Sequence, residues 1–497
     1  MTINILLEAI LGKSCLMEGT FGDSTPFTSN STNVAEDLCE RLERNGFEKH
    51  GWEELTSGIT GEPINAKVFF APQYYQRLKH MVGDKIHCLD FNTEVLTLNG
   101  WKTVYQLTKN DLIATLKDEQ LVYEKPIDIM IYNDYEGPMY YIKNSSIDFA
   151  VTGNHRMWTS KRYGRKCEWK PYDFERADEI VGKHRKYKKN AIWNKEDYQF
   201  ILPGVTKFIT PTYDEYLEPR NIDMKEWLTF FGIWYAEGWA SGTNTKGVVT
   251  ISVNKQRVKD NLFSILDNFV NYSYDEEEEK VNIYDYQLYR YMKPLSVGAE
   301  SKKLPDWVFE LSCEQTKYLI RGMLLGDGSK NKNTECEFYY TTSIELASQF
   351  QQLCLHAGWA GTISVSIEAG NETIINGRKV VANYDTLRVS VIKKKLYPSV
   401  NHSHVSKQNV QEEQYIENEK CPVFCLQVPS EVFYVRRNGK CAWTANSRSQ
   451  GQYGHSNIKN IASKSLYFCN INKLRENLVM SLILNYYRNI IMVLVNY

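Results

Sequence analysis

The spacing of apolar residues changes several times along the chain, and each change predicts a different kind of element. Near the N-terminus, "NILLEAILGK" and "VAEDLCERLERNGF" repeat apolar positions at helical intervals, which predicts two helices. After them, Pro72 separates a short strand from a basic helix that contains Arg77 and Lys85. We expect residues 1–87 to form a small α+β segment with too little chain for an independent core of the usual size.

From Cys88 onward the apolar residues alternate with polar ones. "EVLTL", "DIMIY", "MYYIK" and "DFAVTGNH" are short strand-like runs separated by turn residues, which predicts a mainly-β unit over residues 88–200. Its last part is basic, from "KRYGRKCEWK" to "KHRKYKKN". This stretch fits either a solvated loop or a contact with nucleic acid.

Residues 220–400 return to a helical period. "MKEWLTFFGIWYAEG" and "EQTKYLIRGMLLGDG" are apolar runs of helix length, each followed by strands such as "GVVTISVN" and "TLRVSVIKKK". The same order of helix and strands occurs twice, which indicates an α/β unit built on an internal repeat. Each helical run ends in an acid before a glycine, at Glu237 and at Asp327.

The polar segment 401–420 shows no period, which predicts a linker. Two strand-like runs follow, "VFCLQV" and "VFYVRR", so the strand-rich pattern resumes over residues 421–446. Residues 447–497 shift toward Asn, Ile, Lys, Leu and Tyr, and we interpret them as an aberrant or disordered tail, with a frameshift as one explanation. The chain is therefore multidomain, as its 497 residues also suggest.

Charge and cysteine content narrow the classes of protein. The chain has 59 basic and 60 acidic residues, so any nucleic-acid surface must be local. The eleven cysteines are scattered, and "MTINILLEAILGK" lacks the features of a signal peptide. We expect an intracellular protein (cytoplasm, nucleus or viral factory) that is not secreted. No uninterrupted apolar run is long enough to cross a membrane, so we expect no membrane partner.

Cys88 and the "TANS" sequence far downstream can carry out chemistry on the backbone. A cysteine thiolate can attack the carbonyl of the peptide bond before it and convert an amide to a thioester. Asn446 can attack its own carbonyl through its side-chain nitrogen, and Ser447 offers a hydroxyl that accepts an acyl group. Taken singly, such a cysteine is usually structural and Asn-Ser is an ordinary turn.

The sequence "VTGNH" adds an acid–base candidate to the first junction. It lies where the β unit would place a hydrogen-bonding group and an imidazole, Thr152 and His155, beside the bond before Cys88. Histidine is the natural side chain for protonating a leaving amide near neutral pH.

Together these motifs resemble an intein of the Hint family inserted within a host protein. "CLDFNTEVLT" resembles the opening block, Thr152 and His155 the Thr-x-x-His block, and "VFCLQVPSEVFYVRRNGKCAWTAN" the closing blocks. The resemblance implies a horseshoe-shaped β domain in two parts, 88–200 and 421–446, that splices itself out without a cofactor. Ala445 departs from the family, which often has His there. Cys425 stands where Asp is common, either as an acid or thiol that couples the steps or as a small strand residue.

The repeat in 220–400 resembles the paired LAGLIDADG helices of homing endonucleases, which commonly interrupt inteins. Small residues recur at helical spacing before both acids, which allows the two helices to pack closely. The resemblance implies that Glu237 and Asp327 bind Mg²⁺ and that the domain cuts double-stranded DNA. "SKKLPDW" resembles a further block of that family, in which Lys302 or Lys303 would aid catalysis or contact DNA.

The flanking residues 1–87 resemble the second-largest subunit of multisubunit RNA polymerases. "GDSTPF" and "TGEPINAKVFFAPQYYQRLKHMVGDKIH" carry this resemblance. It implies that Lys85 and Arg77 contact nucleic acid at the polymerase active centre, and that the partners are other polymerase subunits and a DNA–RNA hybrid. The whole chain would be a polymerase precursor interrupted by a splicing insert of 88–446.

Two other readings stay open. One is an autoprocessing Hint domain that cleaves without ligation, as in hedgehog-type proteins, although those lack a terminal Asn and a downstream nucleophile. The other is a polymerase fragment with an inert, decayed insert.

Overall fold

The computed structural model describes residues 4–22, 34–72, 87–163, 168–210, 213–243, 246–331, 336–375, 378–401 and 411–446. The chain divides into two compact units, one that contains the described residues 4–72 and one that spans Met81–Tyr453. Within the described residues, no helix is both long and apolar enough to cross a membrane.

The first unit contains the two helices that the periodicity predicted, α1 (Asn4–Glu18) and α2 (Val34–Arg44). A short antiparallel pair accompanies them, β1 (Trp52–Glu53) and β2 (Val68–Phe69). Buried Lys13 lies between the elements, where its ammonium donates to Glu53 and to the carbonyl of Phe70. The basic helix predicted around Arg77 and Lys85 lies outside the described residues.

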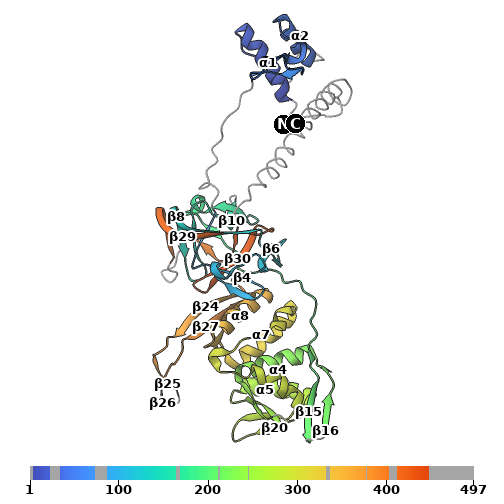
Figure 1. Cartoon of the computed structure of the whole chain (residues 1–497). Coiled ribbons are helices and arrows are strands. Elements are labelled where there is room, and N and C mark those ends of the chain that lie inside the picture. The colour runs from blue at the N-terminus through green and yellow to red at the C-terminus, as the bar shows by residue number, and fades with distance from the viewer. Residues whose placement is uncertain are drawn as a thin grey trace. The chain divides into compact units, whose positions relative to one another are not determined.

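The second unit is built around a sheet of ten strands (Figure 1). In spatial order its strands are β22 (Gly328–Lys330), β23 (Glu337–Thr341), β27 (Thr386–Ile392), β24 (Ala360–Ile367), β31 (Lys440–Ala445), β30 (Val432–Arg437), β4 (Glu94–Thr97), β6 (Ile113–Lys117) and β7 (Gln120–Glu124), with β5 (Gly100–Lys102) paired to β4. The link between β24 and β31 is the pair Thr362↔Lys440. This sheet therefore joins the predicted nuclease region to the closing strands of the predicted splicing region.

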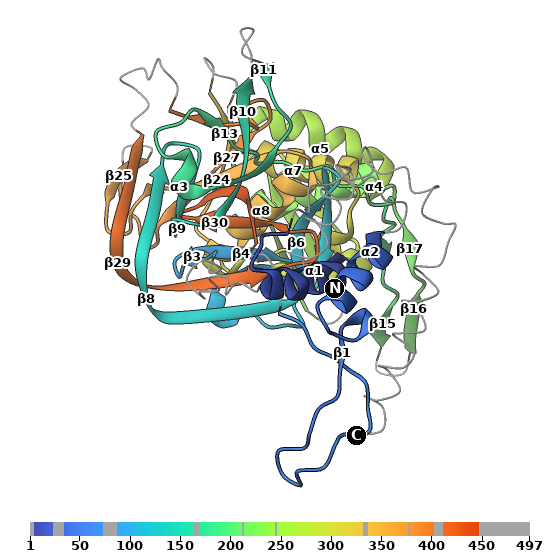
Figure 2. The same ribbon diagram turned by 90° about the horizontal axis from the view of Figure 1, so that it is seen from above.

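Four further strands close into a ring beside the start of the insert. They are β29 (Glu412–Gln427), β3 (Leu89–Asp90), β9 (Asp148–Thr152) and β8 (Asp128–Lys143). Figure 2 shows β8 and β29 as two long curved strands that run side by side, in agreement with their antiparallel register from Glu412↔Lys143 to Gln427↔Asp128. The short strands β10 (Arg156–Tyr163), β11 (Glu168–Trp169), β12 (Asp173–Arg176), β13 (Arg185–Lys186) and β28 (Ser399–Val400) form a second small sheet, and helix α3 (Ala177–Ile180) follows β12.

Two predictions for this region were wrong. "DIMIY" and "MYYIK" were expected as separate strands, but both belong to β8, which continues through Gly137 and Pro138. The expected linker 401–420 ends in strand instead, because β29 begins at Glu412. Pairing with β8 supplies hydrogen-bond partners to a charged sequence that has no apolar period of its own.

The basic stretch 183–190 is also not a solvated loop. Lys188 and Lys189 are only 2% and 0% exposed, and burial lowers the pKa of each to about 8. Lys189 donates to the carbonyl of Ser146 at 2.8 Å and to the hydroxyl of Thr362 on β24 at 3.2 Å. These lysines therefore bridge segments of the fold.

The helical part of the second unit shows the expected repeat. Helix, two strands, helix and two strands occur first as α4 (Met224–Glu237), β18 (Gly238–Gly242), β19 (Gly247–Ser252), α5 (Gln256–Phe269), β20 (Tyr272–Asp275) and β21 (Lys280–Ile283). They occur again as α7 (Cys313–Asp327), β22, β23, α8 (Ile344–His356), β24 and β27. Figure 1 shows α4 and α7 next to each other, with α5 and α8 beside them.

Short elements complete the second unit. They are α6 (Tyr286–Met292), the pairs β14 (Ile201–Leu202) with β17 (Arg220–Asn221), β15 (Val205–Thr210) with β16 (Tyr213–Leu217) and β25 (Glu372–Ile375) with β26 (Arg378–Val381), and 3₁₀ turns at Val104–Gln106, Lys293–Leu295, Ala299–Ser301 and Asp306–Glu310.

Candidate functional sites: two backbone junctions and an acid pair

The first candidate site surrounds the peptide bond between His87 and Cys88. Cys88 is completely buried and directly precedes β3, which pairs with β29 on one side and with β9 on the other. These neighbours place the cysteine next to the end of β9, where the "VTGNH" sequence begins. The strand pairing thus brings together residues that are 64 positions apart.

Thr152 holds the amide of Cys88 in place through the backbone and the side chain. The N–H of Cys88 donates to the Thr152 hydroxyl at 3.0 Å, and the N–H of Thr152 donates to the Cys88 carbonyl at 3.0 Å. The Thr152 hydroxyl donates in turn to Oδ1 of Asn154 at 2.9 Å. On the other side of the junction, Nδ1 of His87 donates to the carbonyl of Asn154 at 2.6 Å. Both residues of the first junction are therefore fixed by the same short turn.

His155 lies in the same buried cluster. Burial is the main reason that its pKa falls to about 3, and the charges of His87 and Arg156 lower it further, while the backbone of His87 opposes the shift. The imidazole is therefore neutral at physiological pH. Its Nε2 lies 2.8 Å from the hydroxyl of Thr444, and its buried Nδ1 has no hydrogen-bond partner within the described part of the chain.

Cys425 on β29 is bonded to Cys88. The two cysteines form a disulfide with their Cα atoms 4.4 Å apart, although 337 positions separate them in sequence. Both are buried, with 0% and 1% exposed surface. Cys88 was predicted as a thiol nucleophile and Cys425 as an acid, a thiol or a small strand residue. In this oxidised form neither carries a free thiol, so the expected attack requires prior reduction.

The second junction lies at the end of β31. Asn446 is 3% exposed, its side-chain nitrogen donates to the carbonyl of Val428 at 2.7 Å, and its backbone N–H donates to the carbonyl of Glu431 at 2.8 Å. Its buried Oδ1 has no hydrogen-bond partner among the described residues. Ser447 lies outside the described residues.

The two junctions are close in space because Thr444 belongs to the strand that ends at Asn446. Its hydroxyl contacts the imidazole of His155, and the backbone N–H of His155 donates to the carbonyl of Thr152 at 2.9 Å. A continuous chain of contacts therefore runs from the start of the predicted insert to its end. No sequence pattern marks Thr444, because a threonine within a strand carries no signal of its own.

The second candidate site lies where helices α4 and α7 end. A Cβ atom added to Gly232 would lie 2.7 Å from the carbonyl oxygen of Leu319, and one added to Gly322 would lie 2.6 Å from that of Thr229. The predicted close packing of the two helices is thus confirmed, and it depends on these glycines. At the C-terminal ends, a Cβ on Gly326 would meet Ala236 at 2.2 Å.

This packing brings Glu237 and Asp327 into electrostatic contact. The pKa of Asp327 is raised to about 6, first by burial and then by the carboxylate of Glu237, while Lys255, Lys302 and Arg257 act in the opposite direction. Two ionised carboxylates held close together repel each other and destabilise the fold unless nearby cations balance their charge.

Two basic side chains at the start of α5, Lys255 and Arg257, lie beside the acids and bind the ends of α4 and α7. Lys255 forms an ion pair with Glu237 and donates to the carbonyl of Gly326 at 2.8 Å. Arg257 donates to the carbonyls of Leu325, Gly326 and Gly328 at 2.7, 2.9 and 2.6 Å. The sequence analysis did not identify either residue, because their chain segment, "VNKQRVKD", resembles any charged helix start.

Of the two lysines predicted from the sequence, only Lys302 lies near Glu237 and Asp327. Its ammonium donates to the carbonyl of Tyr235 at 2.7 Å, and burial lowers its pKa while Asp327 and Glu237 oppose that shift. Lys303 is exposed and instead lines a separate cleft.

The acid pair fits a hard divalent cation. Mg²⁺ keeps several water ligands and is commonly bound by one or two carboxylates together with substrate phosphates. Within the described residues, no group of three or more His, Cys, Asp and Glu side chains forms a larger metal site. Glu237 and Asp327 are thus a donor set of the right chemistry for a shared metal, at a place where one acid is already destabilised by its neighbour.

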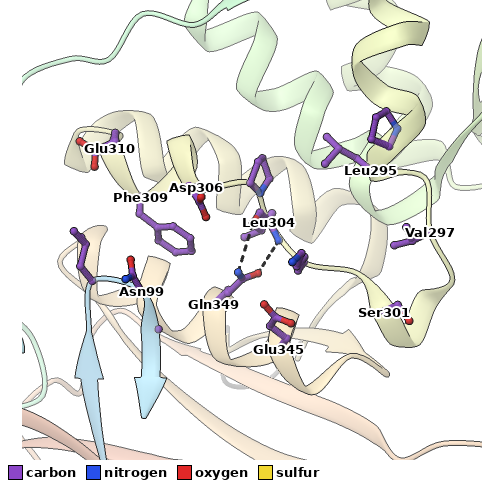
Figure 3. Close-up of a pocket in the computed structure, with 15 residues that line it drawn as sticks. Asn99, Leu295, Val297, Ser301, Leu304, Asp306, Phe309, Glu310, Glu345 and Gln349 are labelled. Carbon is purple, nitrogen blue, oxygen red and sulfur yellow. Dashed lines mark hydrogen bonds between the residues drawn. The ribbon is translucent and has the colours of Figure 1, made fainter. Parts of the chain in front are cut away.

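A cleft of about 650 Å³ lies apart from both sites (Figure 3). Turn residues around Asn99 form one wall, and Gln349 on α8 lies in its middle, where its side chain accepts from the N–H of Leu304 at 2.6 Å. Asp306, Glu310 and Glu345 also line it. Of the predicted site residues only Lys303 lines this cleft, and the three acids around it do not suit a phosphate backbone.

Comparison with known proteins finds matches for the N-terminal residues and for a much longer stretch of the chain. Residues 1–92 match the model of the family described as RNA polymerase Rpb2, domain 6. RNA polymerase II subunit RPB2 of Encephalitozoon cuniculi is 48% identical over 87 residues, which is 18% of this chain and 7% of that protein. Lys85 and Arg77, predicted to contact nucleic acid, belong to this matched segment but lie outside the described residues.

Two relatives match far more of the chain. The C-terminal section of the RNA polymerase β subunit of Stigeoclonium helveticum is 36% identical over 443 residues, covering 80% of this chain and 40% of that protein. The ATP-dependent Clp protease proteolytic subunit of Chlamydomonas moewusii is 30% identical over 476 residues, covering 75% of this chain and 46% of that protein. Both alignments extend far beyond residue 92, so the shared sequence includes the insert. The chain spans less than half the length of these curated relatives.

Solved structures show weaker likeness. Variants of the homing endonuclease I-DmoI align with 34% of this chain and 88% of that chain, at 9% identity and a TM-score of 0.24. A class 3 split intein named AceL NrdHF aligns with 40% of this chain and 98% of that chain, at 14% identity and a TM-score of 0.16. The sequence matches thus relate residues 1–92 to the Rpb2 domain 6 family, and most of the chain to a section of an RNA polymerase β subunit of which it covers 40%.

Proposed function

We propose that residues 88–446 are a self-splicing intein, a Hint-type β domain split by a LAGLIDADG endonuclease. The observation that carries this proposal is the meeting of the two junctions. Cys88 is held by Thr152, and the strand that ends at Asn446 contacts His155 in the same buried cluster. One imidazole thus lies between the turn that holds Cys88 and the strand that ends at Asn446, an arrangement that an inert insert does not need.

The proposed splicing reaction begins with reduction of the Cys88–Cys425 disulfide by a thiol reductant, which gives two thiols. The Cys88 sulfur then attacks the carbonyl carbon of His87, the C–N bond breaks, and the Cys88 nitrogen gains a proton. Thr152 orients that nitrogen, since its hydroxyl accepts from the N–H at 3.0 Å. The acyl group next moves from sulfur to the Ser447 oxygen. Asn446 closes on its own carbonyl, which breaks its peptide bond to Ser447, releases the insert with a terminal succinimide and frees the Ser447 amino group. This amine then attacks the ester, so that the acyl group moves from the Ser447 oxygen to its nitrogen and a peptide bond joins the flanking segments.

The order of these steps matters because Asn446 must not react first. Its side-chain nitrogen is the nucleophile, and it is engaged with the carbonyl of Val428 at 2.7 Å. A change at this contact is therefore needed before cyclisation, which favours late release of the second junction. A cleaving Hint domain without ligation would not need a buried terminal asparagine, which disfavours that alternative.

The full chain tests this function directly. Wild-type protein in a reducing buffer is expected to release a product of 359 residues, while Asn446→Ala protein is expected to keep the insert joined to the downstream residues. Mass spectrometry distinguishes the two. Persistence of only full-length wild-type chain under reducing conditions would support an inert insert instead.

We also propose that the inserted domain cuts double-stranded DNA, with the uninterrupted host gene as substrate. Glu237 and Asp327 would hold Mg²⁺, which, when bound, stabilises the negative charge that develops on the scissile phosphate. Lys302 and Lys255 lie beside the acids, and Lys303 is exposed on the same segment as Lys302. A cleft next to Gly328 offers a surface for DNA phosphates, because its five basic residues, Arg257, Lys317, Arg321, Lys330 and Lys393, outnumber its two acids, Glu314 and Glu337.

DNA cutting has its own test. The wild-type chain is expected to linearise a plasmid that carries the uninterrupted host sequence in the presence of Mg²⁺, and Asp327→Asn is expected to abolish this. A plasmid with the insert in place serves as the control substrate.

For the host part, we propose an intracellular RNA polymerase role after splicing. Lys85 and Arg77 would neutralise nucleic-acid phosphates near the active centre, together with other subunits and the DNA–RNA hybrid. The junction lies only three residues from Lys85, so an unspliced chain would interrupt this surface.

A further inference from the structure

The hydroxyl of Thr444 is the only described side-chain partner of the His155 ring. Both residues are completely buried, and the hydroxyl oxygen lies 2.8 Å from Nε2. Thr444 is held in β31 by its register with Phe433 on β30, two residues before Asn446. The contact therefore joins rigid backbone at one junction to the acid–base candidate at the other.

The second ring nitrogen faces the first junction. Nδ1 of His155 is buried without a hydrogen-bond partner among the described residues, and the backbone of His87 is close enough to affect the ring's protonation. A neutral imidazole carries a proton on one nitrogen and a lone pair on the other. The Thr444 hydroxyl can accept from Nε2–H or donate to a bare Nε2, so this contact couples the tautomer of the ring to the strand that ends at Asn446.

We propose that Thr444 is a positioning residue for splicing, which accepts a hydrogen bond from Nε2–H of His155 and so directs the Nδ1 lone pair toward the His87–Cys88 peptide. This inference rests on the proposed splicing function. In many enzymes a third group orients the base that activates a nucleophile, and here the Thr444 hydroxyl would orient His155 beside Cys88.

The proposed tautomer balances the first step. Nδ1 takes the proton of the Cys88 thiol, which makes the thiolate that attacks the His87 carbonyl and leaves an imidazolium. The same Nδ1–H then protonates the Cys88 nitrogen as the C–N bond breaks, and the ring returns to its neutral form. Throughout, Nε2–H stays bonded to Thr444. With the opposite tautomer, Nδ1 would have no lone pair to accept the thiol proton.

Thr444 also acts at both junctions through one strand. A shift of β31 that carries Asn446 moves the hydroxyl that orients His155, since only Ala445 lies between them. Ala445 offers no side chain that could bind either junction. Under this proposal, the state of the second junction is communicated to the first by the Thr444–His155 contact.

The test isolates the first step in the full chain with Asn446→Ala, where added thiol releases residues 1–87 by attacking the thioester. In that background, Thr444→Val keeps the shape but removes the acceptor, while Thr444→Ser keeps the hydroxyl. We expect Thr444→Val to release the fragment roughly 10- to 100-fold more slowly, as for loss of an oriented base, and Thr444→Ser to stay within about threefold. Equal rates for all three proteins, or equal slowing in both variants, would overturn the proposal.

A spectroscopic measurement does not depend on how the variants fold. In reduced protein with ¹⁵N-labelled histidine, the ring nitrogens of His155 are expected to show the proton on Nε2 while Thr444 is present. The proton on Nδ1 would overturn the proposal. If the Asn446→Ala chain with Thr444 intact releases no fragment with thiol, the splicing function itself fails, which is a different outcome from a failed Thr444 role.

Discussion

The chemistry at single residues depends on contacts that cross long stretches of sequence. Cys88 is held by Thr152, bonded to Cys425 and connected through His155 to Thr444. The disulfide is the contact with the most direct effect, because a sulfur in a disulfide cannot act as the attacking thiolate. Reduction is thus the first requirement for reaction.

We therefore predict that splicing depends on reductant. Chain isolated without reductant should remain full length and should not react with iodoacetamide at Cys88, and a thiol or phosphine should start release of the insert. Cys425→Ser should lose this dependence, so that its rates with and without reductant are equal, whatever their absolute value. Mass spectrometry of timed samples gives both rates. Equal wild-type rates under both conditions would contradict the prediction.

Asp327 gives a prediction for stability and pH. Its pKa rises from 3.8 to about 6 in the fold, mainly through burial, so the folded protein binds more protons than the unfolded chain between these values. The free energy of unfolding therefore falls as pH rises through this window and stays lowered above it. One unit of pKa shift corresponds to about 1.36 kcal/mol, so at pH 8 the raised pKa of Asp327 lowers the free energy of unfolding by about 3 kcal/mol.

Asp327→Asn should consequently stabilise the protein by about 2–3 kcal/mol at pH 8 and by little at pH 4. Urea unfolding at the two pH values, without divalent metal, measures the difference. Asp214→Asn on exposed β16 is the matched control and should change stability at neither pH. Equal effects of Asp327→Asn at pH 4 and pH 8 would show that the fold does not raise the pKa of this carboxyl.

The motif residues themselves could be predicted from sequence, but their partners could not. Cys88, His155, Asn446 and the two acids each stand in a recognisable local pattern. Thr444 and the Cys88–Cys425 bond depend on which strands pair, and nothing within "CAWTAN" or "VFCLQV" specifies a partner hundreds of positions away.

At the scale of elements, the glycines of α4 and α7 set the distance between the two acids. The backbones approach so closely that carbonyl oxygens occupy the space of a missing Cβ atom. This geometry was predictable, because small residues at helical spacing leave only one face on which two helices can meet.

Gly322→Ala should separate these helices. Its new Cβ would lie 2.6 Å from the carbonyl oxygen of Thr229, which belongs to backbone and cannot rotate away. We expect a loss of about 1–3 kcal/mol in unfolding free energy, as for an overpacked core, together with loss of DNA cutting. Gly12→Ala on α1 is a helical control whose added Cβ meets nothing nearer than 3.8 Å, and it should be neutral or slightly stabilising. Urea unfolding and the plasmid assay report the two effects.

The strands β8 and β29 show where sequence patterns fail. Gly137 and Pro138 resemble a turn, and "EEQYIENEK" resembles a linker, yet both lie within paired strands. Cross-strand contacts explain the difference. Tyr140, for example, donates from its hydroxyl to Glu413 at 2.7 Å, so an isolated charged residue gains a partner that only the neighbouring strand supplies.

On the scale of the whole molecule, the predicted nuclease region, residues 220–400, is not a detachable module. Strand β24 pairs with β31, and Leu355 on α8 packs in one cluster with Cys441 and Trp443. The buried hydroxyl of Tyr123 contacts Nε2 of His356 at 2.7 Å, which adds a polar connection to the same boundary. The sheet that carries the second junction thus continues into the nuclease.

Deleting the nuclease region should therefore slow splicing even though no splicing residue is removed. Replacing residues 201–395 by a short Gly/Ser linker would expose the edge of β31 and its apolar cluster. We expect aggregation or at least a tenfold lower splicing rate. Removal of the β25–β26 pair, a separate two-stranded sheet, is the control and should leave splicing unchanged. A deletion variant that splices at the wild-type rate would show that β31 needs no neighbour.

The shared sheet has a consequence for how such an element would decay over generations. Under the proposed functions, a lineage that gained nothing from DNA cutting could discard Glu237 or Asp327 by point mutation at no harm to excision. Loss of whole strands would instead endanger the host gene at once. Silent copies of this element are therefore expected to keep their full length long after their carboxylates have disappeared.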